Sequence, residues 1–157
     1  MAIRSALLTL LLLLVGGSFG AELEPLVSIR QDLAGAGAHT KELMLMPDGT
    51  VVEEEWNTYA KRISEIDVRK QVRKVPMERV GSLVARAAAL IDGLPNDVND
   101  NPLSEVDPQT KAIRITFNGK KLFAGWSSYE HTPSGSKAAD FQRAWQSIDK
   151  LLRGPNA

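Results

Sequence analysis

The segment KAIRITFNGKKLFAGW, residues 111–126, carries the clearest fold signal in the chain. At its centre lies Asn118-Gly119, a pair typical of two-residue hairpin turns because those turns require positive φ at both positions. Apolar residues flank this pair on both sides, at Ile113, Ile115, Phe117 and Leu122. We therefore expect two antiparallel strands joined by a tight turn.

Further strands are expected upstream of this hairpin. Residues 26–33 read LVSIRQDL and alternate apolar with polar side chains, which is typical of a half-buried strand. Residues 41–46 and 50–56 flank a Pro-Asp-Gly turn at 47–49. Because Pro presets the first turn position and Gly accepts positive φ, these two stretches should pair as a second hairpin.

Two segments have the periodicity of amphipathic helices. The first begins at Pro76, repeats apolar residues at three- and four-residue spacing as far as Ile91, and ends at Gly93. The second follows Ser136, a suitable N-cap, and stops at Gly154. Its apolar face comprises Phe141, Trp145, Ile148 and Leu152.

The order of these elements indicates the fold class. Residues 57–75 fit neither a helical nor a strand period cleanly, and we expect a strand only near 69–75. Strands, a helix, a strand pair and a closing helix then follow one another. This order predicts an α+β, two-layer domain in which an antiparallel sheet of about five or six strands packs under two helices.

The N-terminal residues are typical of a secretory signal peptide. Arg4 precedes an apolar run, and Ser18 and Gly20 place small residues before the expected cut. The run is shorter than the roughly 20 residues that span a bilayer. We expect residues 1–20 to be removed, leaving residues 21–157 as a single α+β domain without an integral membrane segment.

The amino-acid composition limits the cellular compartments and the classes of partner that we expect. The chain has no cysteine, and its 19 basic and 19 acidic residues balance. A small eukaryotic secreted domain would normally carry disulfides, so we expect a bacterial protein that is periplasmic or extracellular. A neutral charge balance gives no general attraction to nucleic acid, and we expect none as a partner.

No motif for catalysis or metal binding stands out. His39 and His131 are the only histidines, and no H-x-x-x-H spacing accompanies them. The Asp/Asn-rich stretch 97–108 opens like a calcium loop but has Pro where Gly and the closing Glu are required. Residues 134–136 do not match G-x-S-x-G. We therefore expect no catalytic residue, metal or cofactor, and a protein that is not an enzyme.

Partner-binding residues are expected in a Gly/Ala-rich loop and after the last strand. Phe123 and Trp126 should lie on opposite faces of that strand, so apolar surface should point away from the helices. Exposed aromatic residues beside a loop are typical of recognition surfaces, although Trp126 could instead close the rim of the core. The candidates are Gly35, Gly37, His39, Trp126, Tyr129 and His131.

Local runs of charge have two readings. Glu53, Glu54 and Glu55 are consecutive, and basic residues gather between 61 and 74. These runs either meet a partner or complement each other across adjacent strands.

The layout also has a family resemblance. A strand entering a Gly-rich loop at 29–37, a turn with Asp48-Gly49 within 43–52, one amphipathic helix, a strand pair and a closing helix follow in order. This layout resembles the emfourin-type proteinaceous inhibitors of thermolysin-like metallopeptidases and related exported bacterial domains. The loop here reads AGAGAH instead of the fuller Gly-Gly-aromatic form of that family, and residues 57–75 and 93–110 look like insertions.

The resemblance implies a domain that binds another protein. Its sharpest version is a peptidase inhibitor whose loop 34–40 enters the protease cleft. The alternative from the residues themselves is a periplasmic binder of a small ligand or cell-envelope component, using the concave face of the sheet. A weak hydrolase is a third reading.

Overall fold

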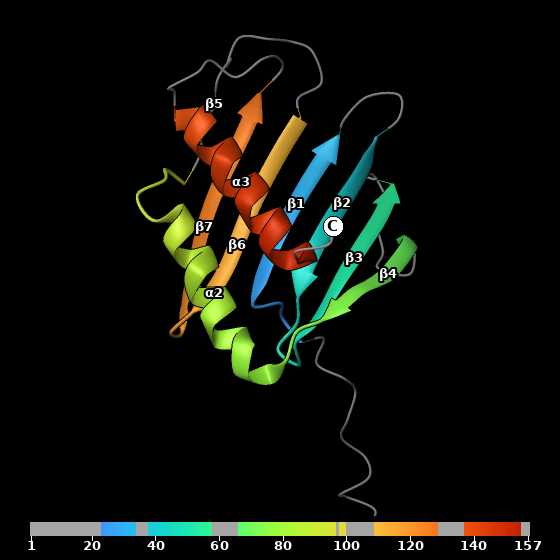
Figure 1. Ribbon diagram of the computed structural model, residues 1–157. Coiled ribbons are helices and arrows are strands. Elements are labelled where there is room, and N and C mark those ends of the chain that lie inside the picture. Colours follow the sequence, from blue (N-terminus) through green and yellow to red (C-terminus); the bar gives the residue numbers. More distant parts are fainter. Residues whose placement is uncertain are drawn as a thin grey trace, which may run out of the picture.

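A computed structural model describes residues 23–33, 38–57, 66–96, 98–99, 109–128 and 137–154. All of the described strands belong to one open sheet with the order β4-β3-β2-β1-β6-β7-β5 (Figure 1). The elements are β1 (Val27–Leu33), β2 (His39–Leu45), β3 (Thr50–Asn57), β4 (Ile66–Lys74), α2 (Met77–Ile91), β5 (Val98–Asn99), β6 (Gln109–Phe117), β7 (Lys120–Ser128) and α3 (Lys137–Arg153).

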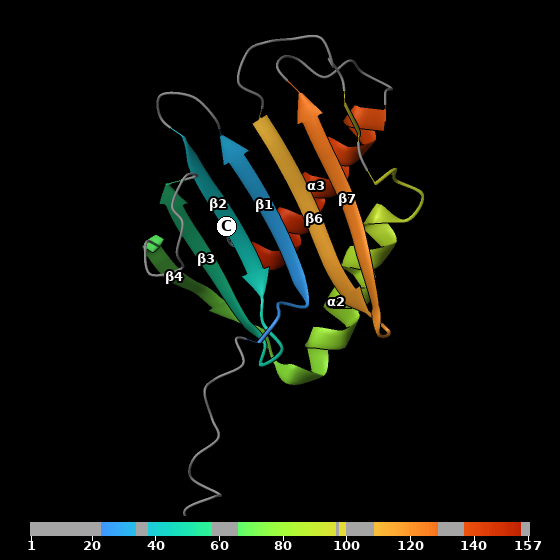
Figure 2. The same ribbon diagram turned by 180° about the vertical axis from the view of Figure 1, so that it is seen from behind.

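The expected fold class is confirmed. Six strands pair antiparallel, and the two-residue β5 adds a short parallel pairing beside β7. The two described helices, α2 and α3, pack on the same side of the sheet, while the other side faces the viewer in Figure 2. The predicted signal peptide and Ser136 lie outside the described residues and stay predictions.

The hairpin at Asn118-Gly119 is confirmed, with φ of 49° and 72° at its two turn residues. The strand expected near 69–75 starts earlier, at Ile66. The reason is its place at the edge of the sheet, where Val68, Arg69 and Lys70 are all exposed. An edge strand with little buried surface has no need of the alternation that reveals a half-buried strand.

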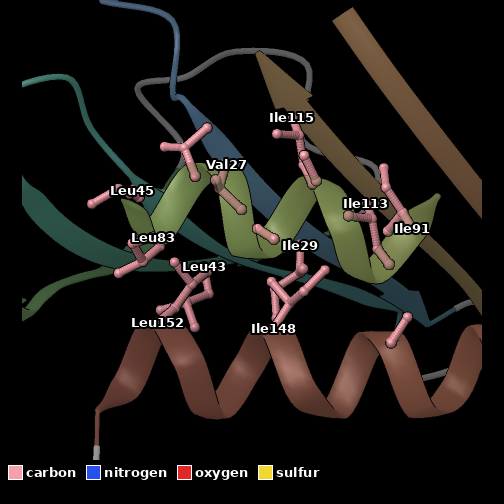
Figure 3. Close-up of a cluster of buried hydrophobic side chains, with 14 of the residues drawn as sticks. Val27, Ile29, Leu43, Leu45, Leu83, Ile91, Ile113, Ile115, Ile148 and Leu152 are labelled. Carbon is pink, nitrogen blue, oxygen red and sulfur yellow. The ribbon is translucent and has the colours of Figure 1, made fainter. Parts of the chain in front are cut away.

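The core lies between the sheet and the two helices. β1 runs through the middle of the sheet, and its Val27 and Ile29 are almost completely buried. Figure 3 shows these side chains between the two helices. Each helix contributes one apolar face, with Val80, Leu83, Val84, Ala87, Ala88 and Ile91 from α2 and Ala138, Phe141, Ala144, Ile148 and Leu152 from α3.

The turn between β2 and β3 is tied to the start of α2. The Gly49 carbonyl accepts a hydrogen bond from the Val75 amide at 2.8 Å. Asp48 accepts bonds from the Thr50 amide (2.9 Å) and from the Lys74 ammonium (2.8 Å), and these bonds lower the pKa of Asp48. A Cβ on Gly49 would lie 2.4 Å from the Val75 carbonyl oxygen. Glycine is therefore required here by contact as well as by its φ of 83°.

The C-terminal end of α3 is fastened to β3 and β4. Arg153 forms a two-pronged ion pair with Glu53, with N–O distances of 2.7 and 3.2 Å. Arg73 donates to the carbonyl oxygens of Leu152 (2.5 Å) and Leu151 (2.6 Å). These carbonyls belong to the last turn of the helix, where intrahelical donors run out.

We predict that Gly49→Ala destabilises the protein more than Gly119→Ala. Both glycines have positive φ, but a Cβ on Gly119 would meet nothing within 4 Å. Gly119→Ala should cost about 1 kcal/mol from backbone strain alone, and Gly49→Ala about 2–3 kcal/mol or more because the Val75 carbonyl must also move. Urea unfolding of the two variants measures both costs. Equal costs would show that contact with Val75 does not constrain the turn.

We predict that Glu53→Gln lowers stability at neutral pH but not in acid. The hydrogen-bonded ion pair with Arg153 lowers the pKa of Glu53 below its ordinary value of 4.5. Its stabilisation is therefore present above that value and is lost as the pH falls through the lower, folded-state pKa. The cost should be roughly 1 kcal/mol at about pH 7 and should shrink towards about pH 3 in urea titrations.

The matched control for this prediction is Glu24→Gln. Glu24 also pairs with a cation, Lys121, but its side chain is 72% exposed, against 28% for Glu53. It should show little cost at either pH, because exposed ion pairs contribute little. A Glu53→Gln cost that does not change with pH would contradict the linkage.

Candidate functional site

The predicted partner-binding residues divide into two groups. Gly35, Gly37, Tyr129 and His131 lie outside the described residues, so their role stays a prediction. His39 and Trp126 are described, and they belong to β2 and β7, with β1 and β6 between those strands. The structure does not bring His39 and Trp126 together into one surface.

The expectation that Trp126 offers exposed aromatic surface is corrected by the structure. Trp126 is 6% exposed and stacks on Phe141 of α3, with ring centroids 6.5 Å apart. Its neighbour on the same face of the strand, Ala124, is fully buried. Of the two readings of Trp126, packing in the core is therefore the one observed. His39 lies at the start of β2, with Nε2 3.9 Å from a carboxylate oxygen of Glu55.

Five strand ends that border undescribed segments of the chain lie at the same end of the sheet. The strand ends next to segments 34–37, 58–65, 100–108 and 129–136 are Cα partners across five strands, in the order Asn57, His39, Leu33, Gln109 and Ser128. Loops connected at neighbouring strand ends can act on one partner.

A different surface stands out among the described residues. No described helix covers the second face of the sheet, which Figure 2 shows directly. We call this surface the open face. It is formed by the alternate strand positions that point away from Val27 and Ile29, including Ser28, Arg30, Glu42, Met44, Val52, Glu54, Trp56, Arg114 and Phe123.

One row of the open face combines apolar side chains with one aromatic ring and one cation. In register across five strands it contains Phe123, Arg114, Ser28, Met44 and Val52. Ser28 and Val52 are buried within it, whereas Phe123 and Arg114 are exposed. Phe123 is 43% exposed, and the Arg114 guanidinium lies 5.9 Å from its ring centroid. The solvent face of an antiparallel sheet is usually polar. The prediction that apolar surface points away from the helices is confirmed, with Phe123 as its main element.

A shallow groove runs beside Phe123. Its volume is about 330 Å³, and its lining includes Pro25, Ser28, Glu42, Arg114 and Phe123. The rim carries the ion pair between Lys121 and Glu24, with an N–O distance of 2.8 Å. The groove therefore combines the aromatic ring of Phe123 with positively and negatively charged side chains.

The next row of the open face is charged. It runs Arg30, Glu42, Glu54 and Arg69 in register. Glu54 pairs with Arg69 at 3.2 Å, so complementary charge across adjacent strands is confirmed for this pair. Arg30 turns to Asp32 instead, at 3.0 Å, and lies 5.4 Å from the ring centroid of Trp56. Glu42 therefore lies beside a second carboxylate and forms no ion pair with a described residue.

Asp32 holds this part of the open face together. Its carboxylate accepts hydrogen bonds from Thr40 (2.6 Å) and Thr110 (3.3 Å) as well as from Arg30. These donors come from β2, β6 and β1 itself. The network fixes the Arg30 guanidinium above Trp56 before any partner arrives.

Lys111 is the notable charged group on the helix side. Its ammonium lies 5.4 Å from the ring centroids of both Trp126 and Trp145 and donates to the Gln142 amide oxygen at 3.0 Å. Burial lowers the pKa of Lys111, whereas the two indole faces favour the charged form. Lys111 thus joins β6 to α3, and we assign it a structural role.

The described part of the chain contains neither a cluster of metal-ligating side chains nor a membrane-spanning helix. There, no group of three or more His, Asp or Glu residues is arranged to hold a metal ion. No described helix has the length and apolar character needed to cross a membrane.

Comparison with known proteins adds no family. No protein-family model matches the chain, and no curated protein matches it. Sequence reasoning did not single out Glu42 or Arg114, because their importance comes from register between distant strands. The alternation of Leu122, Phe123 and Trp126 was the one sequence signal that led to the open face.

Proposed function

We propose that this protein is an exported, non-enzymatic domain that binds another protein, and that the open face is its contact surface. The observation that carries this proposal is the pair of exposed side chains Phe123 and Arg114, which lie side by side on paired strands of the sheet. Aromatic residues and arginine dominate the energetics of protein interfaces. A surface already fixed by strand pairing also loses little conformational entropy on binding.

The open face indicates the chemistry of the partner. An apolar side chain of the partner fits the groove beside Phe123. A lysine or arginine of the partner would supply the counter-charge that Glu42 lacks among the described residues.

Site-specific photo-crosslinking tests this proposal. A photoreactive phenylalanine analogue at position 123 should yield a covalent adduct with one protein in the exported fraction of the native host. The same analogue at Met77, which is 60% exposed on α2, should not. Adducts from both positions, or from neither, would contradict the assignment of the open face.

Once the partner is known, Phe123→Ala should weaken its binding by about 30-fold. The free energy of unfolding should fall by no more than about 1 kcal/mol, since the side chain lies outside the core. Leu90→Ala, which truncates an exposed apolar residue of α2, is the matched control and should leave affinity unchanged.

Inhibition of a thermolysin-like metallopeptidase is the sharper form of the proposal, and the resemblance to emfourin-type inhibitors supports it. Its test is an inhibition assay with thermolysin. If loop 34–40 enters the cleft, Gly37→Arg should abolish inhibition. Gly81→Arg is the matched control, because a side chain at Gly81 on α2 meets nothing within 4 Å. Absence of inhibition would reject the peptidase-inhibitor proposal. Protein binding by the open face would still be tested separately by the crosslinking experiment.

Small-ligand binding is the second candidate function, favoured by the groove of about 330 Å³ on the same face. Its volume is within the range of small-molecule sites. Native mass spectrometry of protein isolated from its host would then show a retained small molecule that Phe123→Ala lacks.

A further inference from the structure

A second groove lies in the helix layer, on the opposite side of the sheet from the open face. It is lined by residues of α2 as far as Arg86 and by the last turns of α3, and its volume is about 650 Å³. Figure 1 shows the two helices next to each other on the same side of the sheet. Val75 and Leu83, both buried, contribute apolar surface to it. Its polar lining comprises Arg73, Arg79, Ser82, Arg86, Ser147 and Lys150.

Helical spacing places these polar groups along the two walls. Arg79, Ser82 and Arg86 follow one another at three- and four-residue intervals and share a face of α2. Ser147 and Lys150 are three residues apart on α3. Cationic side chains and hydroxyl groups therefore line the groove from both α2 and α3.

The charges in this groove are of one sign. None of the described residues that line it is acidic. Arg79, Arg86 and Lys150 are exposed and form no ion pair within the described part of the chain. Asp149, next to Lys150 in the sequence, accepts a bond from Arg153 at 3.0 Å and is engaged there.

Arg73 adds a cation that is fixed in place. Its guanidinium donates to the carbonyl oxygens of Leu151 and Leu152, and the residue is only partly exposed. The Arg73 guanidinium is therefore held in place by these two hydrogen bonds. The charged ends of the exposed side chains, in contrast, can move apart. Like charges gathered in one groove repel one another, and a bound anion removes that repulsion.

We propose that the groove between α2 and α3 binds a small organic anion with an apolar body. The apolar part lies against Val75 and Leu83, and a carboxylate or phosphate group is held by Arg79, Arg86 and Lys150. Guanidinium groups suit both anions because they donate in a two-pronged geometry. The site is independent of the open face and of the function proposed for it.

Titration of the ¹⁵N-labelled protein with simple probes tests this inference. Hexyl phosphate and hexanoate carry the two anionic groups, hexanol carries neither, and inorganic phosphate lacks the apolar body. At least one hexyl anion should shift the amide resonances of Ser82 and Ser147, and it should bind more tightly than hexanol or inorganic phosphate. Which anion binds more tightly identifies the preferred group.

Substitutions then separate a built site from general attraction to charge. Arg79→Gln combined with Arg86→Gln should weaken binding of the preferred anion by about tenfold or more. Lys120→Gln removes one exposed charge at the start of β7, outside the groove, and should leave affinity unchanged. Equal binding of hexanol, shifts confined to other regions, or equal affinity of the double variant would each overturn the proposal.

Discussion

Burial of one face of a central strand is the constraint on which the rest of the structure depends. Val27 and Ile29 of β1 are covered by α2 and α3, and strand geometry then sends Ser28 and Arg30 to the opposite side. Because α2 and α3 both pack on the first side, no described helix covers the second. The division of the molecule into a helix layer and an open face follows from this alternation.

Local signals in the sequence were sufficient for most of the fold. The Asn118-Gly119 turn and the two amphipathic helices depend on neighbouring residues and could be predicted. The edge strand β4 was only partly predicted, because exposed positions carry no periodic constraint. The sequence left open whether the Trp126 side chain is exposed or buried. A strand pattern shows that residues alternate between two faces, but it does not show which face the helices cover. The row that joins Arg114 to Ser28 depends on long-range register, which no local pattern encodes.

The open face and the groove between α2 and α3 differ in the interactions that position their side chains. Arg30 and Asp32 are fixed by hydrogen bonds between strands, so the open face is organised by the sheet itself. The groove between α2 and α3 is organised by helix packing and by the bonds of Arg73 to the end of α3. Because the sheet and the core separate the two surfaces, the two proposed ligands would not compete for one site.

The irregular pairing of β4 has a consequence for self-association. Its register with β3 shifts at two points, and Arg69, Lys70 and Lys74 are exposed along it. A bent, positively charged border is a poor template for a strand from another molecule, because incoming copies meet like charge and broken ladder geometry. At the other border, β5 pairs with the end of β7. The sheet can therefore display Phe123 on its open face while its β4 edge resists growth into fibrils.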